Sequence, residues 1–159
     1  MNLDRVLENI RENMEVKQKL LDDPALTPLI RDAVICCVKS IRAGGKILFC
    51  GNGGSAADAQ HLAAELSGRY LIDRPPMNAE ALHVNTSYLT AVANDYSFDQ
   101  VYARRIEAIG KEGDVLVALS TSGNSENVIQ AMMQAKGQGM AVVGLTGKRP
   151  GRMEAVSYT

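Results

Sequence analysis

The chain is short of the features that mark several classes of protein, and cysteine is the first of them. Its 159 residues include three cysteines, and Cys36, Cys37 and Cys50 do not follow the spacing of zinc-binding cysteine pairs. We expect buried, reduced thiols, as suits a reducing cytoplasm. A chain of this length can bury a core without disulfide or metal staples, so one domain over residues 1–159 is predicted.

Excess charge and long apolar runs are missing too. Seventeen basic and 18 acidic residues give a net charge of −1, which indicates neither a nucleic acid nor an anionic membrane surface as a partner. No apolar run approaches the roughly 20 residues of a membrane span, and residues 1–11 lack the apolar centre of a signal peptide. The absence of Gly-x-Gly-x-x-Gly and Gly-Lys-Ser/Thr motifs argues against NAD and ATP as ligands.

Two helices are expected ahead of the first strand. Apolar residues recur at helical spacing over residues 1–21, Asp22-Asp23-Pro24 interrupts the pattern, and a second amphipathic pattern runs from Leu29 to Ile41. Helices in this position are unusual for a plain nucleotide-binding unit, so we expect them to cover a subunit interface. The alternative is that they simply pack on their own sheet.

The remaining sequence alternates between short apolar runs and helical patterns. Near-continuous apolar runs such as Val115 to Leu119 are typical of strands buried on both faces of a parallel sheet. The alternation predicts a doubly wound parallel α/β sheet in three layers, with helices on both faces. The expected strands are 47–50, 79–84, 115–119 and 140–145, and the expected helices are 56–66, 86–93, 97–110 and 127–136.

The stretch from Lys46 to Arg69 is the first candidate site. Its strand ends in Gly51-Asn52-Gly53-Gly54-Ser55, where the glycines allow a sharp turn and leave N–H groups free at the start of a helix. Ser55 stands where an N-cap would be. This arrangement is typical of anion sites, most often for a phosphate or the oxygens of a sugar phosphate.

His61 and Glu65 are four residues apart and therefore lie on one face of the expected helix. Together they are a candidate for half of a zinc site, and the carboxylate is placed for proton transfer. The alternatives are a structural histidine and a solvated helix carboxylate. Asn52, Asn94 and Asp95 have two interpretations as well, because asparagine and aspartate either bind sugar hydroxyls or stabilise turns.

Residues Ser120 to Ser125 carry the strongest chemical signal. Four hydroxyl side chains gather between a buried strand and a helix N-terminus, where hydroxyls and free N–H groups can surround a phosphate without a lysine. The alternative is an ordinary turn with Ser125 as the N-cap and Glu126 as a first-turn acid. A cap needs one hydroxyl rather than four, so phosphate binding is favoured.

On these motifs the chain resembles the sugar isomerase (SIS) domain superfamily and, within it, the phosphoheptose isomerases. The resemblance covers essentially the whole chain, and its specific stretches are residues 51–66, Asn94-Asp95 and 120–125. It implies a cytoplasmic homotetramer without nucleic-acid or membrane partners. The implied reaction is the aldose–ketose isomerisation of sedoheptulose 7-phosphate to D-glycero-D-manno-heptose 7-phosphate, the first step toward the heptose of lipopolysaccharide or capsule.

The resemblance also implies roles for individual residues. Glu65 would move a proton between C1 and C2 through an enediol, with a metal or hydrogen-bond donors stabilising the developing oxyanion. One zinc per subunit would take His61 and Glu65 as ligands. The implied substrate-binding residues are Asn52, Gly53, Gly54, Ser55, Glu65, Asn94 and Asp95 and, for the phosphate, Ser120, Thr121, Ser122 and Ser125.

The sequence departs from the family on its C-terminal side. In the family a further strand and a long helix bring a glutamine and a histidine that complete the zinc site, and the histidine is the partner acid. This sequence stops at Tyr158-Thr159, so we expect either a fragment of a longer protein or a natural short form with weakened or absent activity. The alternative function is a non-catalytic binding protein resembling the DnaA initiator-associating protein DiaA, which is expected to lack the carboxylate that Glu65 provides in this chain.

Overall fold

The computed structural model describes residues 3–149 and 151–157, and the chain divides into two compact units, Met1–Ile35 and Cys36–Thr159. The first unit contains α1 (Leu3–Asp22) and the start of α2 (Leu26–Arg42), and the second contains the end of α2 and everything that follows. The expectation of one domain over residues 1–159 stays a prediction.

The two N-terminal helices are present as predicted. Asp23 separates them, because its carboxylate accepts a hydrogen bond from the Ala25 N–H at 2.9 Å in the turn between them. Helix α1 exposes large apolar side chains, among them Val6, Ile10 and Met14. The end of α2 differs, since Cys36, Cys37 and Ile41 pack against the core on one face of the sheet. The end of α2 therefore packs on its own sheet, which was the alternative to covering a subunit interface.

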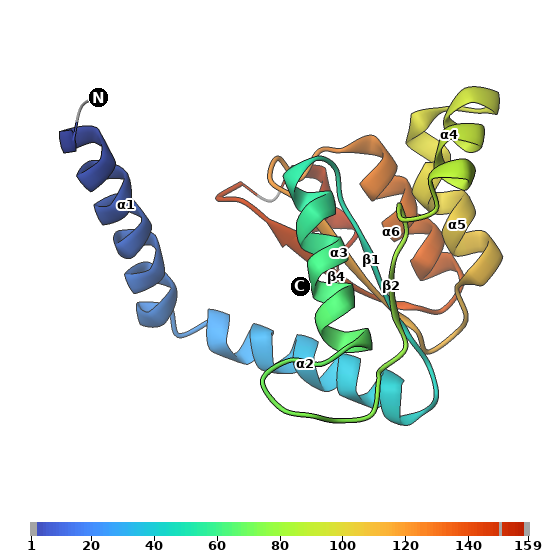
Figure 1. Ribbon diagram of the computed structural model, residues 1–159, viewed down its shortest axis with the longest axis horizontal. Coiled ribbons are helices and arrows are strands. Elements are labelled where there is room, and N and C mark those ends of the chain that lie inside the picture. The colour runs from blue at the N-terminus through green and yellow to red at the C-terminus, as the bar shows by residue number, and fades with distance from the viewer. Residues whose placement is uncertain (1–2, 150, 158–159) are drawn as a thin grey trace. The chain divides into compact units, whose positions relative to one another are not determined.

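The described residues include four parallel strands, which form one sheet in the order β2-β1-β3-β4 and confirm the predicted doubly wound α/β fold. Figure 1 labels β1, β2 and β4 of this sheet. β1 lies between β2 and β3, with Cys50 opposite Ala118, and Ser120 at the end of β3 lies opposite Thr146 of β4. Every residue of β1 and β3 is buried. The strands are β1 (Ile47–Cys50), β2 (Ala79–Ala81), β3 (Val115–Ser120) and β4 (Ala141–Thr146).

Successive side chains of a strand point alternately into two cores. Both faces of the strand are therefore buried, which explains why its sequence is a continuous apolar run. In β3, Val115 and Val117 belong to the core shared with α3 and the end of α2, whereas Leu116 and Ala118 belong to the core shared with α5 and α6. One face of the sheet is covered by α3 (Gly54–Ser67), and the other by α4 (Thr86–Asp95), α5 (Val101–Ile109) and α6 (Glu126–Gly137). The described residues also form two short 3-10 turns, η1 (Phe98–Gln100) and η2 (Gly151–Ala155).

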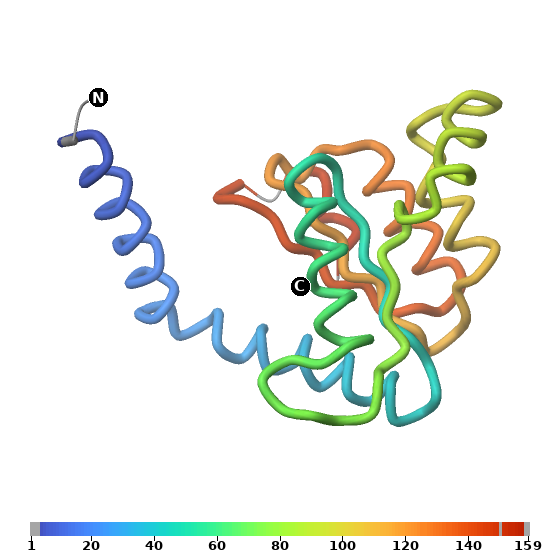
Figure 2. Tube along the Cα trace, viewed as in Figure 1, coloured from blue at the N-terminus to red at the C-terminus, as the bar shows by residue number. Residues whose placement is uncertain are grey.

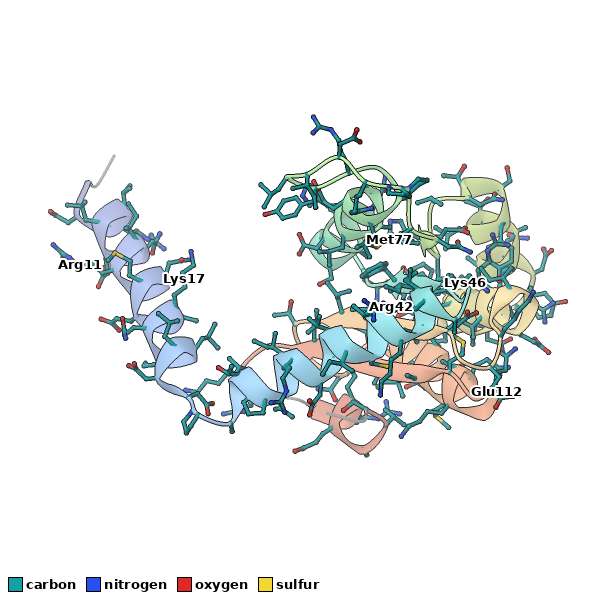
Figure 3. All side chains as sticks on the ribbon, turned by 90° about the horizontal axis from the view of Figure 1, so that it is seen from below. Arg11, Lys17, Arg42, Lys46, Met77 and Glu112 are labelled. Atoms are coloured by element: carbon teal, nitrogen blue, oxygen red, sulfur yellow. The ribbon has the colours of Figure 1, made fainter. Side chains whose placement is uncertain are left out.

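A buried ion pair joins the amino ends of β1 and β3. The Asp114 carboxylate accepts hydrogen bonds from the Lys46 N–H at 2.9 Å, from Lys46 Nζ at 2.6 Å and from the Lys111 N–H at 2.9 Å. Lys46 stands immediately before β1 (Figure 3), so one side chain fixes the segments that lead into the two central strands. The pair lies at the opposite end of these strands from their carboxyl termini.

Two predicted elements differ in extent from those observed. β2 covers residues 79–81 instead of 79–84, because beyond Ala81 a single hydrogen bond from the Leu82 N–H to the Phe49 carbonyl continues the pairing with β1. The helix expected over residues 97–110 divides into η1 and α5.

Two expectations from the sequence concern the ends and the surroundings of the chain. The further strand expected to begin at Tyr158-Thr159 lies outside the described residues. Among the residues that are described, none of the helices combines the length and the apolar character that a membrane crossing requires.

Candidate active site

The carboxyl ends of β1 and β3 form the switch point of the sheet. The chain leaves β1 through α3 for β2 on one side, and it leaves β3 through α6 for β4 on the other. Because α3 and α6 cover opposite faces, the turn after β1 and the loop after β3 diverge at the same end of the sheet (Figure 2). Open α/β sheets bind ligands at this place.

The turn after β1 depends on two glycines. A side chain at Gly51 would place its Cβ 2.7 Å from the Ser55 carbonyl oxygen, and Gly53 has a φ of 55°, in the left-handed region that glycine tolerates. Tyr102 of α5 is buried and donates its hydroxyl to the Gly51 carbonyl at 2.5 Å. Burial raises the pKa of Tyr102 to about 12, so this donor stays protonated near neutral pH.

The predicted N-cap at Ser55 is wrong. Gly53 is the N-cap of α3, and Ser55 already lies inside the first turn, where its N–H donates to the Asn52 carbonyl at 3.0 Å. The sharp glycine turn starts the helix earlier than a serine cap would. Within the described residues no acceptor pairs with the N–H groups of Gly53 and Gly54, and they remain available to an anion.

His61 and Glu65 lie on one face of α3, as predicted. His61 Nε2 and Glu65 Oε1 are 3.5 Å apart, with the histidine side chain 73% exposed and the glutamate side chain 31% exposed. Arg74 fixes the end of the same helix by donating to the carbonyl oxygens of Glu65 at 2.7 Å and Leu66 at 2.9 Å. A cation at a helix C-terminus is stabilising, so the turn that carries Glu65 is well anchored.

The loop after β3 gathers its serine hydroxyls as predicted. Ser120, which is 5% exposed, places its Oγ 2.9 Å from Ser125 Oγ and 3.5 Å from Ser122 Oγ. Ser125 occupies the N-cap position of α6, but its hydroxyl bonds Ser120 instead of a helix N–H. The ordinary capped turn is therefore not what this loop forms. Thr121 is exposed beside the three serines, and we call Ser120 to Ser125 the hydroxyl loop.

An amide pair connects the glycine turn to the start of α6, directly after the hydroxyl loop. Asn52 Nδ2 donates to Asn127 Oδ1 at 2.8 Å, and Asn127 Nδ2 donates back to Asn52 Oδ1 at 2.9 Å. Asn127, the second residue of α6, is 2% exposed. Asn52 thus uses one donor and one acceptor inside the protein, and it keeps one of each for a ligand.

Asn94 and Asp95 lie in the last turn of α4, so the helix predicted over residues 86–93 continues through both of them. Asn94 Nδ2 donates to Asp95 Oδ1 at 2.9 Å. In the described part of the chain, no hydrogen bond links either residue to the glycine turn or the hydroxyl loop. Their contact with substrate stays a prediction.

His83 lies two residues beyond the carboxyl end of β2. Its Nδ1 is buried and has no hydrogen-bond partner among the described residues. Burial lowers the pKa of His83 below its ordinary value, because desolvation disfavours the imidazolium form. The side chain is therefore neutral near neutral pH.

Sequence reasoning missed three residues that shape the site, and all three act over long distances in sequence. Asn127 and Tyr102 reach partners 75 and 51 residues away. Arg152 reaches back 26 residues, with Nη1 2.6 Å from Glu126 Oε2 at the start of α6. Hydrogen bonds from Arg152 and then from Gln130 lower the pKa of Glu126. No local pattern in the sequence announces contacts of this kind.

The predicted zinc site has few donors among the described residues. His61 and Glu65 supply one imidazole nitrogen and one carboxylate, and the described residues contain no cluster of three histidine, cysteine, aspartate or glutamate side chains. Zinc takes three or four protein ligands. By themselves, the residues that the structure describes do not make a zinc site.

The chain matches the family model of the SIS domain over residues 11–147. It is 59% identical over 129 residues to the phosphoheptose isomerase of Rhodospirillum rubrum, a match that covers 81% of this chain and 69% of that protein. The chain belongs to the phosphoheptose isomerase family.

Solved structures of phosphoheptose isomerases share the fold. The enzyme from Neisseria gonorrhoeae superposes with a TM-score of 0.88 at 43% identity, covering 97% of this chain and 79% of that one. The enzyme from Francisella tularensis gives a TM-score of 0.93 at 36% identity, covering all of this chain and 83% of that one. The glycine turn, α3 and the hydroxyl loop thus belong to the part of the chain that shares the phosphoheptose isomerase fold.

Proposed function

We propose that the protein is an aldose–ketose isomerase that converts sedoheptulose 7-phosphate to D-glycero-D-manno-heptose 7-phosphate. Membership of the phosphoheptose isomerase family supports this assignment. The single structural observation that carries it is the hydroxyl loop beside a helix N-terminus at the switch point, because that combination suits a phosphate monoester.

The hydroxyl loop is proposed to hold the phosphate. Ser120, Ser122 and Ser125 already converge, and Thr121 adds a fourth hydroxyl from an exposed position. Hydroxyls can turn their hydrogens toward an anion, and the first N–H groups of α6 point the same way. On the other side of the amide pair, Asn52, Gly53 and Gly54 of the glycine turn would contact the sugar, with Ser55 beside them. Asn94 and Asp95 would complete these contacts.

Glu65 is proposed to be the base. In the ketose the carbonyl is at C2, so Glu65 takes a proton from C1 and the electron pair forms the C1–C2 double bond of an enediolate. Glu65 then returns the proton to C2, and the C1 hydroxyl passes its own proton to the C2 oxygen, which leaves an aldehyde at C1 and a hydroxyl at C2. Helix α3 supports this role, since Arg74 anchors the turn that carries Glu65 and the carboxylate is part-exposed.

Zinc belongs to this proposal for a form of the protein that contains the remaining ligands. His61 and Glu65 would be two of the four ligands, and the family resemblance implies a glutamine and a histidine as the other two. When bound, one zinc per subunit would stabilise negative charge on the substrate oxygens.

A cytoplasmic homotetramer is proposed as the working form, serving lipopolysaccharide or capsule synthesis. The apolar side chains that α1 exposes, Val6, Ile10 and Met14 among them, support association, because helices with an apolar stripe bury it against a partner.

A Glu65→Gln variant tests the proposed function. Because the amide cannot accept the C1 proton, kcat for the heptose phosphate should fall by about 10³-fold while KM stays within about threefold. Turnover is measured by coupled detection of the aldose phosphate. Glu112→Gln, an exposed carboxylate just before β3 (Figure 3), is the matched control and should keep full activity. Undiminished turnover in Glu65→Gln would remove Glu65 from the mechanism. A wild-type protein that binds the heptose phosphate without turning it over would favour the DiaA-like alternative.

A further inference from the structure

The segment that follows β4 runs alongside the hydroxyl loop. β3 and β4 are parallel, and Ser120 lies opposite Thr146. The segments that follow the two strands therefore leave the sheet at the same level. The Gly147 N–H then donates to the Thr121 carbonyl at 3.1 Å. A side chain at Gly147 would place its Cβ 2.7 Å from that oxygen, so the close approach requires glycine.

The 3-10 turn η2 docks on the same loop. The Arg152 N–H donates to Asn124 Oδ1 at 3.0 Å, and the Met153 N–H donates to the Gly123 carbonyl at 3.0 Å. Gly151 has a φ of 60°, and a Cβ there would lie 2.7 Å from the Ser122 carbonyl oxygen. Met153 is buried in the core shared with α6, which fixes the turn. The backbone of η2 is therefore held against the loop proposed to bind phosphate.

This docking puts two opposite charges at the rim of the hydroxyl loop. Glu126 directly follows Ser125, and its carboxylate would repel a bound phosphate dianion. Arg152 Nη1 lies 2.6 Å from Glu126 Oε2, and the guanidinium side chain remains 60% exposed. A guanidinium has five N–H donors, so one bond to Glu126 leaves others free. Arg152 thus neutralises the acid and still presents a cation to the solvent beside the loop.

We propose that Arg152 is the cation of the phosphate subsite, where it screens the ligand from Glu126 and raises the affinity for the phosphate group. This inference rests on the proposed phosphate role of the hydroxyl loop. Arg152 acts on binding and takes no part in the movement of the proton, so it affects KM and leaves kcat unchanged.

The test is a charge cycle read by titration calorimetry with inorganic phosphate. Arg152→Gln should raise Kd about fivefold, and Glu126→Gln should lower it about threefold, because each removes one unit charge at a short distance from the anion. The double variant should return to within about twofold of the wild type. Arg149→Gln, which removes the same charge from an exposed arginine and leaves the Arg152–Glu126 pair intact, is the matched control and should change Kd by less than twofold.

The outcomes separate this inference from the proposed function. If Glu126→Gln and Arg152→Gln both weaken phosphate binding equally, the pair is a structural brace and the inference is overturned. The same holds if neither variant changes Kd while the wild type binds phosphate. A wild type that turns over the heptose phosphate without these charge effects would leave the proposed function standing, whereas a wild type that binds no phosphate would overturn both.

Discussion

The reciprocal hydrogen bonds between Asn52 and Asn127 join the glycine turn after β1 to the start of α6. The two helices that follow these segments, α3 and α6, cover opposite faces of the sheet. Each carboxamide satisfies one donor and one acceptor of the other, and Asn127 is almost fully buried. Removing one partner leaves polar atoms of the other without a match, which costs about 1–3 kcal/mol. The pair therefore fixes the glycine turn against the start of α6.

A double-mutant cycle on this pair makes a specific prediction. Asn52→Ala and Asn127→Ala should each lower the free energy of unfolding by about 2 kcal/mol, and the double variant should lose little more than either single variant. Urea denaturation measures all four proteins. Asn127→Ala should also reduce kcat/KM about tenfold, because Asn52 loses its fixed orientation. Strictly additive losses would show that the two amides do not act as a unit.

At the scale of single residues, the sequence indicated which side chains could bind a phosphate, but it did not indicate which residues contact one another in the fold. Ser120, Ser122 and Ser125 could be recognised because four hydroxyls between a strand and a helix exceed what a cap requires. Asn127 looks like an ordinary residue in the first turn of a helix, and Arg152 like one charge in a polar C-terminal stretch. Their roles depend on partners that only the folded sheet brings near.

Among the elements, the two central strands depend on Asp114 at their amino ends. Asp114→Asn exchanges a buried carboxylate for an amide and leaves the Lys46 ammonium without its partner. We expect a loss of about 3 kcal/mol in the free energy of unfolding, with kcat unchanged at temperatures where the variant is folded. Asp32→Asn is the control, since its pair with Arg31 is exposed and contributes little. Equal losses in the two variants would contradict the role of Asp114.

Strands and helices were predictable to different degrees for physical reasons. β1 and β3 carry apolar side chains on both faces, so their continuous runs identify them directly. β2 ends early because its pairing with β1 stops, which no residue pattern records. The start of α3 was misplaced since a glycine with positive φ, rather than the hydroxyl of Ser55, defines the turn.

For the whole molecule, the apolar stripe of α1 predicts association. Ile10→Asp should convert the proposed tetramer to smaller species, because a charge placed in an apolar contact is costly to bury. Lys19→Gln is the control: at about 100° per residue it lies on the opposite side of α1 and causes the same change in charge. Light scattering coupled to size exclusion gives the mass of each protein. A wild type that already elutes as a monomer would contradict the proposed tetramer.

Helices α3 and α6 begin at the same edge of the sheet although they cover opposite faces. The positive ends of their backbone dipoles therefore meet at the switch point, in a protein whose net charge is −1. Attraction that originates in main-chain amides cannot be deleted by exchanging side chains. The contribution of the backbone to binding the proposed phosphate should therefore persist when the side chains at this edge are exchanged.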